Sequence, residues 1–474
     1  MAESSPAAKY PVKKIVGGLL GLAVGLTFAF LPAPDGLTRQ SMIGIGIFLW
    51  AIIHWVFNVY SFFLTAMAMG VGFALFKVAP FATVYSGFTN TTWWFMLGAM
   101  GMSAALQKSG LMKRFAYNIM KLFSPTFRGQ AVGLMATGAI ITPLIPSVTA
   151  KTAMGMPIAK GVADSMGYAK KSKELHGLWL AAFVGFTLTS YCFVSSNFFC
   201  YFASGLLPAG SSMSWLNWLL ASLVWGVIIL AGSLLAILFL YKPKKESSQL
   251  TKEYITGELK VMGPLSRNEK ITGVIFIITI LMWITENLHG ISGNLVAILG
   301  LLVLIVLNVI SVQDFKNGVP WDMLLMIGTL MGMGAVLKEV KITEYIANVA
   351  APLVNMISGN VYLFIICLSV GLYIIRYVYS DVMSILAVFM PLLLPLATAA
   401  GISPWIVAFT ILTSSATWNV IYQNTFAMQG FAAFGGEENV KFGSLSKLSY
   451  VYMGLNLVGL LVSVPIWQLV GLIH

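Results

Sequence analysis

Charged residues are scarce in this chain of 474 residues. They make up 9% of the sequence, hydrophobic residues make up 58%, and the mean hydropathy is +0.87. A soluble globular domain carries about 25% charged residues. The composition therefore excludes an ordinary soluble domain and predicts an all-α polytopic membrane protein, with room for about ten to twelve crossings of roughly 20 residues each.

Motifs for enzyme chemistry are also missing. The four histidines are scattered singly, and the sequence contains no H-E-x-x-H, no G-x-S-x-G and no phosphate-binding loop. Cys192, Cys200 and Cys367 fall in predicted membrane segments without metal-ligand spacing, so we interpret them as small core residues. The sequence thus predicts no enzyme, no cofactor and no metal site.

The net charge of +12 has two readings, a nucleic-acid partner or cytoplasmic loops rich in Lys and Arg. The basic residues cluster between apolar segments, so we favour cytoplasmic loops and exclude nucleic acid. By this rule the N-terminus is cytoplasmic and the C-terminus is outside.

The apolar segments predict about 11 transmembrane helices plus two re-entrant hairpins. Spans are expected at about 15–31, 41–57, 60–77, 91–107, 175–207, 215–241, 270–286, 293–311, from Trp321 onward, 404–430 and 448–472. The expected organisation is an N-terminal segment with the first span (1–40), a first repeat (41–241), a cytoplasmic linker (242–270) and a second repeat (271–474).

The stretch Ile141 to Pro157 is apolar enough for a membrane but cannot cross it as a continuous helix. Prolines 143, 146 and 157 predict a break around Ser147 to Thr149. Freed backbone groups in hydrocarbon need partners, so such a break lines a cavity or is buried in protein. Basic clusters on both sides predict a re-entrant hairpin at about 126–164. The alternative is a proline-kinked span without a ligand.

The second half of the chain repeats this pattern. Ser380-Asp381-Val382 precedes Met390-Pro391 much as Ser147-Val148-Thr149 precedes Met156-Pro157, at an offset of 380 − 147 = 233. This predicts a second hairpin at about 358–400. Polar inserts in the spans at 175–207 and 404–430 also correspond. An odd number of crossings in each half predicts an inverted-topology repeat, in which the broken segments meet near the midplane.

Two hairpin tips entering from opposite faces bring hydroxyls, backbone N–H groups and two cations together, which suits a dianion. An Arg376–Asp381 pair that neutralises itself is the alternative for those two charges. The candidate substrate-binding residues are Ser147, Val148, Thr149, Lys151, Ser195, Ser196, Asn197, Arg376, Ser380, Asp381, Val382, Gln423 and Asn424.

At these tips the chain resembles the divalent anion/sodium symporter (DASS) family, in particular its citrate/succinate antiporters and 2-oxoglutarate/malate translocators. Residues 147–151 stand at the position of a family motif S-N-T-A-R, and residues 380–382 stand at the second S-N-T. The resemblance implies scaffold and transport domains, a homodimer in the lipid membrane and an elevator movement. It also implies that Ser147 and Thr149 bind one carboxylate, that Ser380 binds the other, and that Asn197 and Asn424 shape the unwound regions.

Two departures from the family motif bear on ion coupling. Family symporters use both motif asparagines at sodium sites, whereas this chain has Val148 and Asp381. Valine offers no oxygen to a hard cation, and Asp381 is a weak sodium candidate. We therefore predict a plasma-membrane antiporter that exchanges dicarboxylates of the malate, succinate and 2-oxoglutarate class without sodium, with Lys151 or Arg376 supplying the positive charge.

Two alternatives stay open at this point. The first is a sodium-coupled di- or tricarboxylate symporter, and the second is a membrane scaffold or sensor that transports nothing. The paired polar breaks favour a transporter over the second alternative.

Overall fold

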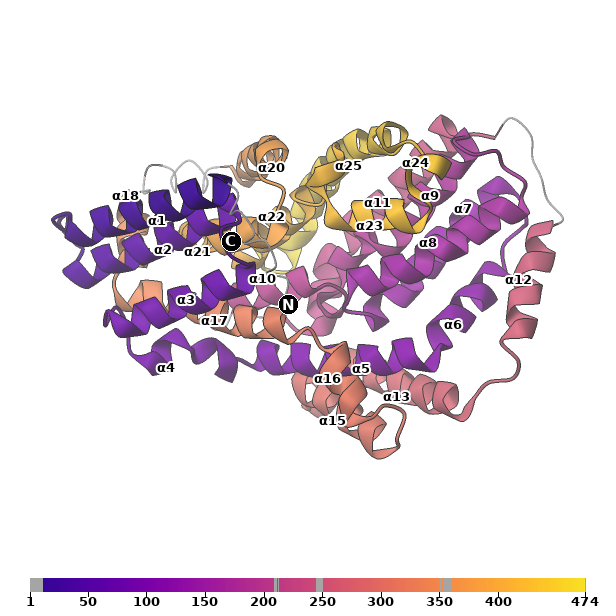
Figure 1. Cartoon of the computed structure of the whole chain (residues 1–474), viewed down its shortest axis with the longest axis horizontal. Coiled ribbons are helices and arrows are strands. Elements are labelled where there is room, and N and C mark those ends of the chain that lie inside the picture. The colour runs from indigo at the N-terminus through magenta and orange to yellow at the C-terminus, as the bar shows by residue number, and fades with distance from the viewer. Residues whose placement is uncertain are drawn as a thin grey trace, which may run out of the picture.

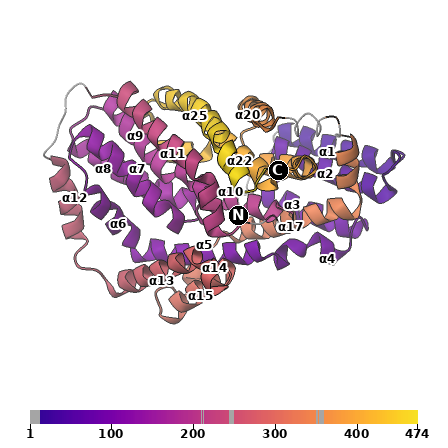
Figure 2. The same cartoon turned by 180° about the vertical axis from the view of Figure 1, so that it is seen from behind.

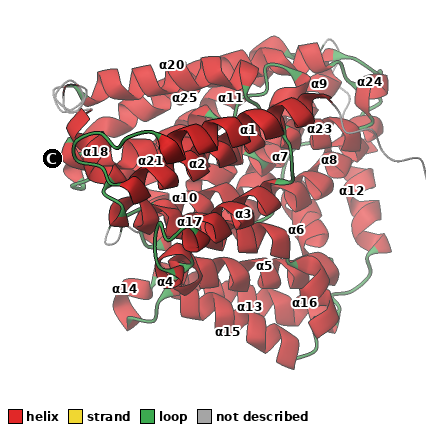
Figure 3. Ribbon diagram, turned by 60° about the vertical axis from the view of Figure 1, so that its left-hand side comes forward, coloured by secondary structure: helices red, strands yellow, loops and turns green. Residues whose placement is uncertain are grey.

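The structure is a computed structural model that describes residues 12–208, 211, 213–243, 250–349, 352 and 360–473. The predictions for residues 1–11 of the N-terminal segment, for residues 244–249 of the linker and for residues 358–359 of the second hairpin lie outside this part. Within it the chain is helical throughout, and the β pairing consists of an isolated bridge between Ile402 and Ile473 (Figures 1 and 3).

Eight described helices are long and apolar enough to cross a membrane, and three shorter apolar helices accompany them. The predicted all-α polytopic membrane protein is confirmed. The helices α1–α4 lie at one end of the long axis and α7–α9 with α12 lie at the other (Figures 1 and 2).

The helices of the first half follow the predicted order of spans. They are α1 (Val12–Phe30), α2 (Arg39–Phe57), α3 (Phe62–Leu75), α4 (Phe81–Val84), η1 (Ser86–Thr89), α5 (Thr91–Ser109), α6 (Leu111–Met120), α7 (Phe127–Ile141), η2 (Thr142–Leu144), α8 (Val148–Ser165), α9 (Lys173–Phe186), η3 (Leu188–Cys192), η4 (Val194–Ser196), α10 (Phe198–Leu206) and α11 (Trp215–Leu240).

The linker and the second half contain a parallel series. They comprise α12 (Leu250–Val261), α13 (Arg267–Ile284), α14 (Glu286–His289), α15 (Gly293–Val306), α16 (Val312–Gly318), α17 (Trp321–Glu339), α18 (Ile342–Val349), α20 (Val361–Val378), α21 (Val382–Ala399), α22 (Pro404–Ser414), η5 (Ile421–Gln423), α23 (Thr425–Ala433), α24 (Gly436–Asn439) and α25 (Phe442–Leu469).

Helices of one half pack on helices of the other half, and the corresponding helices pack in the same way with the two halves exchanged. Helix α5 packs on α15, and the corresponding pair α17 and α3 also pack together. Helix α8 packs on α23, and its counterpart α21 packs on α10. The equivalent helices α11 and α25 contact each other. The order of the elements and these contacts therefore correspond between the two halves.

Close backbone approach holds the first hairpin against its broken helix. A Cβ on Gly138 of α7 would lie 2.2 Å from the carbonyl carbon of Gly185 on α9, so only glycine allows this contact. Small residues serve this purpose widely in membrane helices, because the dispersion contacts of closely packed backbones replace the hydrophobic effect. This packing sets the position of the hairpin tip.

Several details of the sequence predictions are wrong. Of the three prolines from which we predicted the first break, Pro157 lies inside α8 and interrupts no helix, and Pro391 and Pro395 lie inside α21 in the same way. The first break instead covers η2 and the extended residues up to Ser147. Neighbouring helices can compensate the donor that each proline removes. Cys367 is exposed, unlike the buried Cys192 and Cys200, so it is not a core residue.

The described part of the linker is docked rather than free. Arg114 of α6 donates to Glu269 of α13 at 2.6 Å and to the carbonyl oxygens of Met262 and Gly263 at 3.0 and 2.7 Å. Lys113 pairs with Glu258 of α12 at 3.0 Å. The basic residues that we placed in cytoplasmic loops thus also hold the linker against the bundle.

Candidate substrate-binding site

Four helices begin at the two breaks, and each has a polar N-cap. Ser147 Oγ caps α8 and the Asp381 carboxylate caps α21, while Asn197 and Asn424 cap α10 and α23. The start of a helix carries a partial positive charge and leaves N–H groups without intrahelical partners. Four such ends, a matched pair from each half, make this region suited to anions.

The caps revise the register between the halves by one residue. The structurally equivalent caps are Ser147 and Asp381, at an offset of 381 − 147 = 234. The two Met-Pro pairs, at 156 and 390, have the same offset, 390 − 156 = 234. Asp381 therefore occupies the place of Ser147 and not that of Val148, and Val148 corresponds to Val382.

The first break is held closed by its own side chains. Ser195 Oγ donates to the Pro143 carbonyl at 2.9 Å and accepts from Trp215 Nε1 at 2.8 Å. Ser196 Oγ donates to the Phe193 carbonyl at 3.0 Å. These two hydroxyls join the hairpin tip, the unwound segment and α11, so in this conformation both are engaged within the protein.

Lys151 is buried, with 0% of its surface exposed, and its ammonium group donates to the carbonyl oxygen of Ser196 at 2.6 Å. The unwound segment has freed this carbonyl from helical hydrogen bonding. A positive charge from the hairpin thus satisfies an acceptor on the broken helix, and no carboxylate pairs with Lys151 in the described residues.

Arg376 plays the corresponding part at the second break. It is buried, with 0% of its surface exposed, and its guanidinium donates to the carbonyls of Ser380 and Gln423, and to that of Tyr379 at 3.4 Å. It forms no ion pair with Asp381 in the described structure. The Asp381 carboxylate instead accepts from the backbone N–H of Ser384 at 2.7 Å, as its helix cap requires.

A small cavity of about 30 Å³ lies at the second break. It is lined by Tyr191, Phe199, Ser380, Asp381, Val382, Gln423, Asn424, Thr425 and Phe426. Both halves of the chain contribute, because Tyr191 and Phe199 flank the first break. A space of roughly 10–15 Å³ is enough for one water molecule, so this cavity is large enough for water but must widen before it admits a C4 dianion.

The cavity brings together some of the sequence-predicted residues. Ser380, Asp381, Val382, Gln423 and Asn424 line it. The predicted residues that do not line it are Ser147, Val148, Thr149, Lys151, Ser195, Ser196, Asn197 and Arg376.

The two asparagines have backbone partners. Asn424 Oδ1 accepts from the N–H groups of Phe426 and Ala427 at 3.0 and 3.1 Å, and its Nδ2 donates to the Ala416 carbonyl at 3.1 Å. Asn197 Oδ1 accepts from the Phe199 N–H at 3.0 Å. These contacts shape the helix starts beside the cavity.

Tyr191, Phe199, Thr425 and Phe426 line the cavity and were missed by sequence reasoning. Tyr191 directly follows the polar insert Thr189-Ser190, which was an available signal. The two phenylalanines carry no chemical pattern that distinguishes them from core residues.

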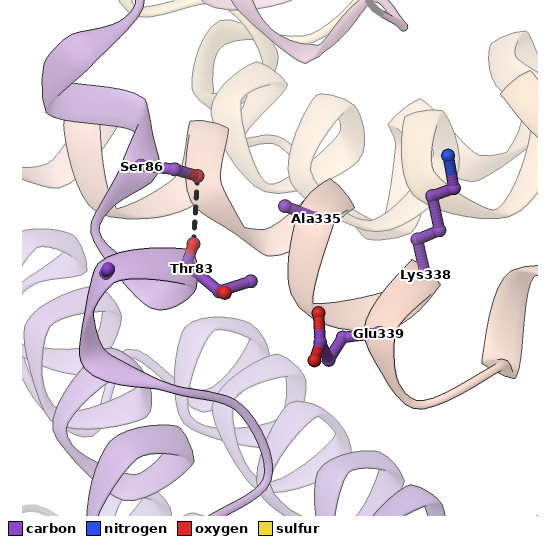
Figure 4. Close-up of a pocket in the computed structure, with 6 residues that line it drawn as sticks. Thr83, Ser86, Ala335, Lys338 and Glu339 are labelled. Atoms are coloured by element: carbon purple, nitrogen blue, oxygen red, sulfur yellow. Dashed lines mark hydrogen bonds between the residues drawn. The ribbon is translucent and has the colours of Figure 1, made fainter.

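A larger crevice of about 710 Å³ lies away from both breaks (Figure 4). It is lined by Ala82, Thr83, Ser86, Ala335, Lys338 and Glu339 of α4, η1 and α17. It is wide open, and none of its lining residues belongs to either break. The smaller cavity is the stronger candidate, because the caps Asp381 and Asn424 of the second half line it together with Tyr191 from the unwound segment of the first half.

Together, the apolar bundle, the two interrupted helices and the capped helix starts define an integral membrane protein of the secondary-transporter class. The family described as "Sodium:sulfate symporter transmembrane region" matches residues 12–473, and the chain belongs to that family. The resemblance to the DASS family is thereby confirmed, and the chain is a transporter-family protein rather than an enzyme.

Relatives and a solved structure agree with this assignment. "Dicarboxylate transporter 1, chloroplastic" of Arabidopsis thaliana is 27% identical over 83% of this chain and 72% of its own length. "Inner membrane protein YbhI" of Escherichia coli is 27% identical over 84% of this chain and 86% of its own. The YdaH transporter of Alcanivorax borkumensis shares the fold, with a TM-score of 0.58 and 13% identity, over 97% of this chain and 99% of that one.

Proposed function

We propose that this protein is a secondary active transporter that exchanges dicarboxylates of the malate, succinate and 2-oxoglutarate class across the plasma membrane. The observation that carries the proposal is the matched pair of buried cations, Lys151 on the carbonyl of Ser196 and Arg376 on the carbonyls of Ser380 and Gln423. The names of relatives such as the chloroplastic dicarboxylate transporters support the substrate class.

Sodium independence follows from the atoms that these cations contact. Unwound backbone carbonyls are the groups that coordinate sodium in transporters with broken helices. Here a covalently attached ammonium and guanidinium already use such carbonyls as acceptors. A sodium ion at either place would have to displace a buried charged side chain, and two positive charges would repel each other in a medium of low dielectric constant.

The substrate's charge is opposite to that of the two cations. A dianion that binds near the four capped helix starts gains from the partial charges of those ends and from the nearby fixed charges. Ser147 and Thr149 on the first tip and Ser380 on the second are the hydroxyls that we assign to the two carboxylates. Both tips have to approach the substrate, so binding requires the cavity to widen.

Obligatory exchange follows from the same fixed charges. Without substrate, a segment that carries Lys151 and Arg376 across the membrane moves buried positive charge, which is costly in hydrocarbon. A bound dianion offsets that charge and lowers the barrier. We propose an elevator movement, in which a transport domain with both hairpins slides against a scaffold domain of a homodimer, with the N-terminus cytoplasmic.

Counterflow in proteoliposomes tests this function. We expect vesicles preloaded with unlabelled malate to take up labelled malate, succinate or 2-oxoglutarate equally well in sodium and in choline buffer. Uptake that needs a sodium gradient and no internal substrate would establish the symporter instead. Absence of both counterflow and net uptake by correctly folded protein would favour a scaffold or sensor.

A further inference from the structure

Gln423 is a buried side chain in the cavity wall with one unused donor. It is 0% exposed, and its Oε1 accepts from the backbone N–H of Asn419 at 2.6 Å. A flipped amide would place an NH₂ group against that N–H donor, so the network determines the orientation. Nε2 then has no partner among the described residues. A buried donor without a partner destabilises the protein, and a ligand acceptor would remove this cost.

Asp381 lines the same cavity at an exposed position, and one of its oxygens accepts no hydrogen bond from a described residue. Its Oδ2 accepts from the N–H and the hydroxyl of Ser384. Its Oδ1 has no hydrogen bond to another described residue. A carboxylate has capacity for about four hydrogen bonds and no capacity to donate. The cavity therefore presents an unused donor and an unused anionic acceptor across a space of about 30 Å³.

We propose that this cavity selects dicarboxylates that carry a hydroxyl group on the carbon next to one carboxylate. The hydroxyl of such a 2-hydroxydicarboxylate donates to Asp381 Oδ1, and the adjacent carboxylate accepts from Gln423 Nε2. This inference rests on the proposed function and specifies the substrate class of the same site. A 2-hydroxy acid suits the pair because its hydroxyl and carboxylate are separated by a single carbon atom.

Electrostatics explain why the hydroxyl matters. A dicarboxylate without a hydroxyl presents only acceptors, so its carboxylate beside Asp381 experiences repulsion without a compensating hydrogen bond. A hydroxyl that donates to a carboxylate forms a charge-assisted hydrogen bond, which is about twice as strong as a neutral one. Arg376 binds the carbonyls of Ser380 and Gln423, so its charge lies directly behind the cavity wall and offsets part of the added negative charge.

Competition between malate and succinate tests the inference, because the two differ only by the hydroxyl. We expect L-malate to inhibit exchange by wild-type protein in proteoliposomes at pH 7.5 at a concentration at least about tenfold lower than succinate does. In Asp381→Asn we expect the preference to fall below about threefold, chiefly because succinate binds better. Asparagine is as good an N-cap as aspartate, so α21 keeps its start.

Two further variants complete the design. Gln423→Glu keeps an oxygen for the Asn419 N–H but removes the donor. We expect this variant to weaken the binding of malate and the binding of succinate by a similar factor. Asp314→Asn removes an exposed carboxylate on α16, outside the site, and should leave the preference unchanged. Stabilisation of each purified variant by malate or succinate in thermal unfolding gives a binding readout that does not depend on transport.

Two results would overturn the inference while leaving dicarboxylate exchange intact. These are equal inhibition by malate and succinate in the wild type, and an unchanged preference in Asp381→Asn. Wild-type protein that exchanges neither compound would instead contradict the proposed function itself.

Discussion

The two breaks share one arrangement of helices but differ in the charge that caps them. At the first break, neutral Ser147 caps α8 and Lys151 contacts a single carbonyl. At the second, the carboxylate of Asp381 caps α21 and Arg376 contacts the carbonyls of Ser380 and Gln423. The described cavity lies at the second break. Equivalent backbones thus present different chemistry at the two breaks.

This difference shows which features each half needs and which it can vary. Each break needs a polar helix cap and a cation for its freed carbonyls, because unsatisfied backbone groups are costly inside a membrane. The identity of the cap and of the cation is free to vary, and that variation can provide selectivity. Variants that remove one member of each pair test how far the halves are equivalent.

The largest effect is expected for Arg376→Ala. Loss of the guanidinium leaves the carbonyls of Ser380 and Gln423 without this donor, at about 1–3 kcal/mol each, and removes the fixed charge behind the cavity. We expect counterflow to fall at least about 100-fold, which corresponds to about 2.8 kcal/mol. Arg376→Lys should recover part of the activity. Exchange above half the wild-type rate in Arg376→Ala would exclude Arg376 from the mechanism.

The same variant sharpens the comparison with sodium-coupled relatives. Without the guanidinium, the carbonyls of Ser380 and Gln423 form a set of oxygen ligands of the kind that hard cations prefer. We expect sodium to stimulate residual exchange by Arg376→Ala while leaving the wild type unaffected. The measurement is counterflow in sodium against choline buffer. Equal rates in the two buffers for the variant would argue against a latent cation site.

A smaller effect is expected for Lys151→Ala. This ammonium group has one carbonyl partner, that of Ser196, so less hydrogen bonding is lost than with Arg376, which has three. One unsatisfied acceptor costs about 1–3 kcal/mol, and we expect counterflow to fall about tenfold. The exposed Lys170, which pairs with Glu438, provides a matched control, since Lys170→Ala should keep wild-type exchange. If Lys151→Ala reduces counterflow more than Arg376→Ala does, the first break contributes more to transport than the second.

Thermal unfolding of the asparagine variants compares the two capped helices. Asn424 accepts from two backbone N–H groups and donates to the carbonyls of Ala416 and Thr417, whereas Asn197 accepts from one N–H and donates to the Ser190 hydroxyl. Loss of a cap costs about 0.5–2 kcal/mol. We expect Asn424→Ala to lower the melting temperature more than Asn197→Ala. The reverse order would contradict this ranking of the two breaks.

The smallest effect is expected at an exposed ion pair that joins the two halves. Asp314 lies 2.5 Å from Lys108, and hydrogen bonds from Lys108 and Ser311 lower the pKa of its carboxyl group. Its contribution to stability is therefore present above the unfolded pKa and is lost as the pH falls through the folded pKa. We expect Asp314→Asn to reduce stability slightly at pH 7 and not at strongly acidic pH. An identical loss of stability at both pH values would show that Asp314 stabilises the protein in some way other than through this ion pair.

Membrane class, helix positions and the repeat were predictable from the sequence. Long apolar stretches dictate helices in a membrane because each backbone group must be satisfied internally. Polar and proline-rich residues at matched offsets located both breaks. Errors of detail arose where tertiary packing compensated for local sequence, as for Pro157 inside α8.

What only the tertiary structure decided is the pairing of groups at the breaks. Lys151 and Ser196 are 45 residues apart, as 196 − 151, and Arg376 and Gln423 are 47 apart, as 423 − 376. No periodicity encodes a hydrogen bond across such a separation, because it depends on how whole helices pack. The sequence alone determined that two polar breaks exist. The fold decided that their cations contact carbonyls, that Asp381 corresponds to Ser147, and that Gln423 presents its amide to a cavity.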